Sequence, residues 1–180
     1  MSVAGRVVVG SVLLALAGCT SGDPISRAPL ATSSPWGDLH ARPIIVALSG
    51  AAEPCPVSPA RPIDPRLGDA AGEGPLYAIG LAARLRVGEP NKVLLAIEGS
   101  YQGPILIRAL TLAGSGEFQV SLGDGIRWRS EERIDTSGGR PPGDQRFWNY
   151  TGYAKVSAPG CYAYQVDGSD FSNAIVFQVS

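Results

Sequence analysis

The chain has 180 residues, and its 15 lysines and arginines against 16 aspartates and glutamates give a formal net charge of −1. The basic residues form no run, so the clustered basic surface of a nucleic-acid-binding protein is not expected. Glycine (23) and proline (15) together make up about a fifth of the chain, which is high for a helical protein and fits one domain of short strands joined by turns.

The amino terminus has the layout of an export signal. Arg6 is the only charge in the first eighteen residues, and it is followed by an apolar stretch at residues 7–17. That stretch is shorter than the roughly 20 apolar residues that span a bilayer, and the order of charged, apolar and small residues is typical of a secretory signal. We therefore predict a signal helix within residues 1–18 that is removed on export.

The signal ends at Leu16-Ala17-Gly18-Cys19. These residues resemble the lipobox of bacterial lipoproteins, in which Leu, a small residue and Gly or Ala precede Cys. The resemblance implies that Cys19 is the lipid attachment site, with a diacylglyceryl group on its sulfur and a fatty acid such as palmitate on the new amino terminus. Two or three acyl chains hold a protein firmly, at about 0.8 kcal/mol per buried methylene. The implied location is the extracytoplasmic face of the cell membrane, or of the outer membrane in an organism that has one.

Residues 19–42 are rich in Ser, Pro, Ala, Gly and Asp and predict a flexible tether. The only histidine, His40, falls in this tether, which leaves a Ser-His-Asp or Cys-His catalytic group without a base inside the domain. Residues 43–180 form the predicted domain. Its first part, residues 43–74, is read as an extended wrap pinned at Cys55, because its dense prolines exclude helix and central strand; residues 43–48 are apolar enough for a strand at the domain edge.

Residues 75–180 predict the core of a β-sandwich. Phe118, Val120 and Leu122 alternate with polar residues at the period of two that marks a half-buried strand. Asp124-Gly125 and the glycine- and proline-rich residues 137–144 predict a turn and a loop. We expect strands at residues 76–85 (where a short helix is the alternative), 92–98, 104–112, 117–122, 126–131, 146–156, 161–166 and 173–179.

The segment Pro159-Gly160-Cys161-Tyr162 resembles the start of the penultimate strand in many immunoglobulin-like domains, where a Tyr two residues after Gly forms a tyrosine corner. The resemblance implies that Tyr162 takes this place. The predicted fold is therefore all-β: an immunoglobulin-like antiparallel β-sandwich after an N-terminal signal helix and a flexible tether.

With Cys19 assigned to lipid, Cys55 and Cys161 remain. An even pair of cysteines in an oxidising compartment predicts a disulfide. Two buried free thiols are the main alternative, and a metal site is a weaker one, because two cysteines without a nearby histidine do not fill a tetrahedral site. No metal and no cofactor are expected.

The candidate catalytic residues are few. No G-x-S-x-G, P-loop or H-E-x-x-H motif occurs. Glu131, Glu132 and Asp135 form a local acidic cluster, and a glycosidase needs only two facing acids, but charges on a solvated strand explain these residues better. The segment from Asp167 to Asp170 offers oxygens to calcium, but it lacks the closing Glu of an EF-hand loop, and a hairpin turn is favoured.

Aromatic residues gather on either side of the loop at residues 137–144. Such groups stack on sugars or anchor protein partners, although Trp128, Phe147 and Tyr153 would also serve to fill the core. Because alternate side chains of a strand point to opposite faces, Phe147, Trp148 and Tyr150 do not all face inward. The candidate binding residues are Trp128, Trp148 and Tyr150.

Two functions follow as hypotheses. The first is a membrane-anchored, non-catalytic interaction module of the cell envelope, held to the membrane by lipid on Cys19, with an envelope protein or glycan as partner and no nucleic acid. The alternative is an extracytoplasmic carboxylate-based hydrolase or ligand-sensing domain. Acids facing one another across a cleft would favour the enzyme.

Overall fold

The computed structural model describes residues 34–48, 54–81, 85–143 and 145–180. The predicted signal helix, Cys19 and most of the predicted tether lie outside the described residues. Within the described part of the chain, no helix has the length and apolar character needed to cross a membrane.

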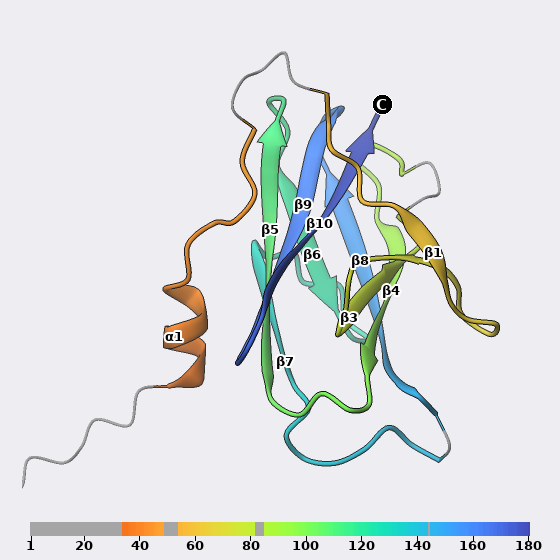
Figure 1. The fold of residues 1–180 in the computed structure, drawn as a ribbon. Coiled ribbons are helices and arrows are strands. Elements are labelled where there is room, and N and C mark those ends of the chain that lie inside the picture. The colour runs from red at the N-terminus through yellow and green to blue at the C-terminus, as the bar shows by residue number, and fades with distance from the viewer. Residues whose placement is uncertain (1–33, 49–53, 82–84, 144) are drawn as a thin grey trace, which may run out of the picture. The chain divides into compact units, whose positions relative to one another are not determined.

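The described residues form one short helix and ten strands (Figure 1). The elements are α1 (Pro35–His40), β1 (Ala60–Asp64), β2 (Gly68–Ala71), β3 (Leu76–Ile79), β4 (Asn91–Glu98), β5 (Pro104–Ala113), β6 (Phe118–Leu122), β7 (Glu131–Asp135), β8 (Phe147–Val156), β9 (Gly160–Gly168) and β10 (Ser172–Val179).

The strands build two antiparallel sheets, ordered β1-β2-β3-β4-β8-β6 and β10-β9-β5-β7. Taken in chain order, strands β3, β4, β5, β6, β8, β9 and β10 occupy the places of strands A to G of an immunoglobulin constant-type sandwich, with A-B-E-D in one sheet and G-F-C in the other. The hairpin β1–β2 extends the first sheet beyond β3, and β7 extends the second beyond β5. The prediction of an all-β, immunoglobulin-like antiparallel sandwich is confirmed.

The main core fills the space between the sheets. Alternate residues of β4 and β9 point into it, including Val93, Leu95, Tyr162 and Tyr164, none of them more than 3% exposed. Phe118 of β6 contacts the rings of Tyr162 and Tyr164 edge-on, with centroids 5.8 and 5.0 Å apart. This packing of rings and β-branched side chains joins the two sheets.

The predicted tyrosine corner is present. The Tyr162 hydroxyl donates a hydrogen bond to the carbonyl oxygen of Ala158, four residues upstream, at 2.5 Å. Gly116 and Gly160 leave room for the ring, since a Cβ on either would lie within 3.1 Å of the Tyr162 hydroxyl. The corner therefore fixes the turn that leads into β9.

The predicted boundary of the tether is wrong by about nine residues. Residues 33–180 form one compact unit, and α1 begins at Pro35, whose fixed φ suits the first turn of a helix. Leu39 is only 3% exposed, and the guanidinium of Arg133 lies 5.6 Å from the centroid of the Trp36 ring. These tertiary contacts order a segment whose composition is that of a linker.

Three further corrections concern strands. Residues 60–64 and 68–71 form a hairpin within the predicted wrap, and Pro62 is tolerated there because β1 is an edge strand. Residues 126–130 form no strand; among them only Arg129 forms a bridge, to Val120, and the next strand, β7, begins at Glu131 and pairs with β5. The predicted strand at residues 43–48 is also absent, although this segment docks on the four-stranded sheet.

The docked segment, residues 41–48 and 54–58, is called the strap. It covers the outer face of β9 and β10, where Cys161, Ala163 and Val176 pack against Val46 and Leu48 of the strap. Ser58 meets Val176 at the edge of β10, through bonds from Ser58 N to the Val176 carbonyl and from Val176 N to the Ser58 hydroxyl, both 2.9 Å. As a result β9 is buried on both of its faces.

Candidate functional site

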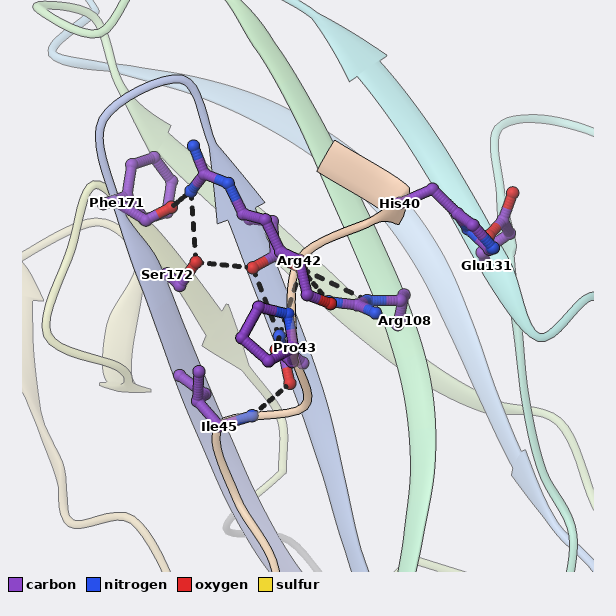
Figure 2. A network of polar contacts seen from close by, with 10 residues as sticks. His40, Arg42, Pro43, Ile45, Arg108, Glu131, Phe171 and Ser172 are labelled. Carbon is purple, nitrogen blue, oxygen red and sulfur yellow. Dashed lines mark hydrogen bonds and ion pairs between the residues drawn. The ribbon is translucent and has the colours of Figure 1, made fainter. Parts of the chain in front are cut away.

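The strap is held by polar contacts as well as apolar ones (Figure 2). The Arg42 guanidinium donates to the carbonyl oxygens of Phe171 and Ser169, at 2.5 and 2.8 Å, and to the Ser172 hydroxyl at 3.1 Å. The side-chain amide of Gln165 donates to the Pro43 carbonyl at 2.8 Å and accepts from the Ile45 N–H at 3.0 Å. Gln165 therefore pairs with the strap backbone as a neighbouring strand would.

A buried ion pair lies beneath this contact. Asp167 is fully buried, and its Oδ2 lies 2.7 Å from a terminal nitrogen of Arg108, whose side chain is 11% exposed. Ser172 donates to Asp167 Oδ1 at 2.6 Å, and Arg108 also donates to the Arg42 carbonyl at 3.1 Å. The Asp167 carboxylate is thus fully engaged in fastening the strap. Its predicted place in a turn needs correcting, because β9 continues through Gly168.

The strap is also fastened covalently. Cys55 and Cys161 form a disulfide, with an S–S distance of 2.05 Å and a sequence separation of 106. The disulfide prediction is confirmed, and the alternatives of two free thiols or a cysteine metal site are wrong. Among the described residues, no group of three or more His, Cys, Asp or Glu side chains is arranged to hold a metal ion.

The structure separates the acidic cluster predicted on β7. Glu131 accepts from His40 Nδ1 of α1 and from Arg133, both at 2.9 Å. Burial opposes ionisation of Glu131, but these two hydrogen bonds prevail and lower its pKa. Asp135 accepts from the N–H and hydroxyl of Ser137, and these bonds lower the pKa of Asp135.

Glu132 alternates with these two residues along β7 and points to the opposite face. It borders a small, largely apolar cavity together with Val93, Ile107 and Tyr164. Burial raises the pKa of Glu132, although the Leu122 N–H donates to its carboxylate at 3.3 Å. The three carboxylates therefore occupy three different environments, and Glu132 does not share a face with the other two.

The predicted aromatic residues do not form one platform. Trp148 and Tyr150 share a face of β8 and pack, partly buried, against the main core. The indole nitrogen of Trp148 is buried and has no hydrogen-bond partner among the described residues. The Lys155 ammonium lies over the Trp128 ring, 5.6 Å from the ring centroid. Lys155 is on the face of β8 opposite to Trp148 and Tyr150. Phe147 also faces outward, where it packs edge-on against Tyr77, 6.0 Å away.

The connections β4–β5 and β7–β8 lie at one end of the sandwich (Figure 1, lower end). Residues of these connections and of the neighbouring turns line two open hollows. The larger hollow, of about 850 Å³, is lined by residues of both connections, among them Arg140 and Arg146. Among the described residues no carboxylate lines it; Asp144, which follows the lining residue Gly143, is not among them. The second hollow, of about 410 Å³, is lined by the carboxylates Glu73, Glu98 and Asp170. Ser100 lines both hollows.

The two connections are fixed where they meet. The buried Thr136 hydroxyl bonds to both the N–H and the carbonyl oxygen of Gly103, at 3.2 and 3.1 Å. The Gly99 N–H donates to the Arg146 carbonyl at 2.8 Å, and a Cβ on Gly99 would lie only 2.7 Å from Pro141 Cγ. The lack of a side chain at Gly99 therefore allows the two connections to pack together.

Sequence reasoning missed both hollows. Glu73, Glu98 and Asp170 are far apart in the chain and carry no shared motif. Arg140 stands in the predicted loop at residues 137–144, and Arg146 stands at the start of the strand predicted at residues 146–156. The one usable signal was that loop itself, because an exposed glycine- and proline-rich connection is where a rigid sandwich commonly places contact residues.

The comparisons with known proteins are sparse. No protein-family model matches the sequence, and no curated protein matches it. Among solved structures, a candidate lipoprotein from Bacillus anthracis is similar, with a TM-score of 0.45 and 12% identity over 71% of this chain and 87% of that one.

Proposed function

We propose that this chain is a lipoprotein anchored through Cys19 to the extracytoplasmic face of a membrane, and that its β-sandwich is a non-catalytic interaction module. The lipobox supports the anchor. The Cys55–Cys161 disulfide supports an oxidising compartment, because structural disulfides persist mainly in exported proteins. In this proposal the contact surface is the end of the sandwich that carries the two hollows, called the loop end.

One observation carries the interaction role: the loop end presents charged side chains that the fold does not use. The side chains of Glu73, Arg140 and Asp170 line its hollows and make no hydrogen bond or ion pair with any other described residue. By contrast, Arg42 of the strap and the ion pair of Arg108 and Asp167 beneath the strap are all engaged. Charged groups held open on fixed connections suit recognition of a partner.

The carboxylate-lined hollow supports the hydrolase as a second candidate. Glu98 accepts a hydrogen bond from the Tyr77 hydroxyl at 2.8 Å, and Glu73 and Asp170 line the same hollow. Hydrolysis of a glycosidic bond needs one acid that donates a proton and a second that acts as base or nucleophile. A Glu98→Gln, Asp170→Asn variant that abolishes hydrolysis of an envelope polymer by the full chain would establish the enzyme over the interaction module.

The interaction role is tested by photo-crosslinking in intact cells. A photoreactive amino acid is placed at Gln102 or Gly139 of the loop end, and at Gly88 or Ser157 of the opposite end as controls. We expect crosslinked adducts from the loop-end positions and few from the controls. Adducts formed equally from both ends, or only from the controls, would contradict the assignment of the contact surface.

A further inference from the structure

We infer that the strap lies against the membrane surface, and that Ile44 and Ile45 enter the boundary between the lipid headgroups and the acyl chains. This inference rests on the proposed lipid anchor and goes beyond it, because it gives the domain a second, non-covalent contact with the same membrane. Three features of the strap support it: exposed apolar side chains, a fixed backbone, and a position in the chain close to the proposed lipid site.

Exposed apolar side chains are concentrated on the strap. Ile44 is 49% exposed and Ile45 is 47% exposed, and the neighbouring Ala47 is exposed as well. Among the described residues five large hydrophobic side chains are exposed, and three of the five, Ile44, Ile45 and Val57, belong to the strap. Single apolar residues scattered over a surface are ordinary, whereas a concentration of them marks a contact surface.

The strap presents these side chains on a fixed backbone. The Gln165 amide pairs with the Pro43 carbonyl and with the Ile45 N–H. Val46 and Leu48 pack inward against β9 and β10. The inward positions of the segment are therefore filled, and the two isoleucines stay exposed in the folded domain. A surface that is already ordered loses little conformational entropy when it makes a contact.

The strap also lies close in sequence to the proposed lipid site. Ser34, where the described domain begins, follows Cys19 by 15 residues. A chain of that length spans at most about 50 Å when fully extended, so a lipid on Cys19 keeps the bilayer within reach of the strap. A surface held nearby by a covalent link needs only a weak second contact, because that contact forms within one molecule. Two half-exposed isoleucines are enough for such a contact.

The chemistry of the strap suits a lipid surface better than a protein partner. The exposed side chains of its described residues are all aliphatic, whereas Trp, Tyr and Arg anchors dominate protein interfaces. Arg42, the one charged residue within 41–48, donates to backbone carbonyls, so the contact does not require anionic lipids. The strap belongs to neither sheet, and burial in hydrocarbon would leave many of its backbone groups without hydrogen bonds. The contact is therefore shallow, at the level of the headgroups.

The test places the photoreactive amino acid p-benzoylphenylalanine at Ala47 of the full chain as cells process it, reconstituted in phosphatidylcholine vesicles. Ultraviolet light joins the probe to nearby acyl chains, and mass spectrometry detects the phospholipid adduct. We expect the adduct from the chain that is otherwise wild type. An added Ile44→Asp, Ile45→Asp change is expected to lower the yield of adduct at least about fivefold, because it replaces apolar contact area by charge.

The matched control is a Val87→Asp, Ile126→Asp change in the same probe-bearing chain. It alters two other exposed apolar residues, both outside the strap, and is expected to leave the yield within about twofold. Circular dichroism and an intact disulfide verify the fold of each variant, and the mass of the intact chain verifies the lipid on Cys19.

The outcomes separate the strap from the anchor. If a lipidated chain gives no adduct at Ala47, or if the strap variant and the control variant give equal yields, the inference is overturned and the anchor stands. A chain that carries no lipid on Cys19 would contradict the proposed function, and the inference would fall with it.

Discussion

Removing the disulfide is expected to cost this domain a large part of its stability. The perturbation is Cys55→Ala with Cys161→Ala, made in a Cys19→Ala background so that neither arm carries a lipid or a free thiol. Alanine is preferred to serine because Cys161 is only 3% exposed and lies in an apolar cluster. A buried hydroxyl without a partner would add a cost of its own.

The magnitude follows from the length of chain that the bridge closes. With a sequence separation of 106 between the cysteines, the chain-entropy model gives about 4 to 5 kcal/mol of stabilisation. A single domain is stable by about 5 to 15 kcal/mol in total. For a domain of this size, a loss of that amount lowers the midpoint of thermal unfolding by about 10 to 15 °C.

The assay is urea unfolding under non-reducing conditions, followed by the fluorescence of the three tryptophans. The control is the Cys19→Ala protein with its disulfide intact. A loss of less than about 1 kcal/mol would refute the reasoning. It would mean that Arg42, Gln165 and the apolar contacts of the strap hold it without the covalent bridge.

Three further predictions use the same unfolding assay. Asp167→Asn leaves the Arg108 guanidinium buried without its partner and is expected to cost about 3 to 5 kcal/mol, so an unchanged midpoint would contradict the role assigned to this ion pair. Tyr162→Phe removes the bond to the Ala158 carbonyl and is expected to cost about 1 kcal/mol; a neutral result would mean that ring packing alone forms the corner. Burial raises the folded-state pKa of Glu132, so its ionised form destabilises the folded protein once the pH rises through that pKa. Glu132→Gln is therefore expected to be more stable than the wild type at pH 7, and this difference in stability is expected to vanish below about pH 4. A difference in stability that is larger in acid than at pH 7 would contradict this reasoning.

The strands that sequence predicted correctly are those whose side chains alternate or form a continuous apolar run. Phe118, Val120 and Leu122 face the core as their period of two required, and the apolar run near Val93 became a central strand. Tyr162 was found through a local motif of four residues. In each case the information lies within the segment itself, because one strand and its immediate turn determine the pattern.

The elements that sequence missed depend on contacts distant in the chain. Gly68–Ala71 has no strand-forming side chains and becomes β2 because it pairs with β1 and β3. Glu131–Asp135 becomes β7 by pairing with β5, whereas the alternating residues before it form only a single bridge, from Arg129 to Val120. α1 is ordered by the burial of Leu39 and by contacts of its other side chains with β7. The loop-end hollows were missed for the same reason, since four separate connections of the chain contribute to them.

The central claim is that lipid on Cys19 anchors this domain outside the cytoplasm. The most direct measurement is metabolic labelling of cells with an alkyne analogue of palmitate, followed by separation of membrane and soluble fractions, for the wild type and for Cys19→Ala. The account predicts that the wild-type chain is labelled and recovered with the membrane, and that the Cys19→Ala chain is unlabelled and recovered outside it. A Cys19→Ala chain that still takes up the label and stays with the membrane would contradict the account.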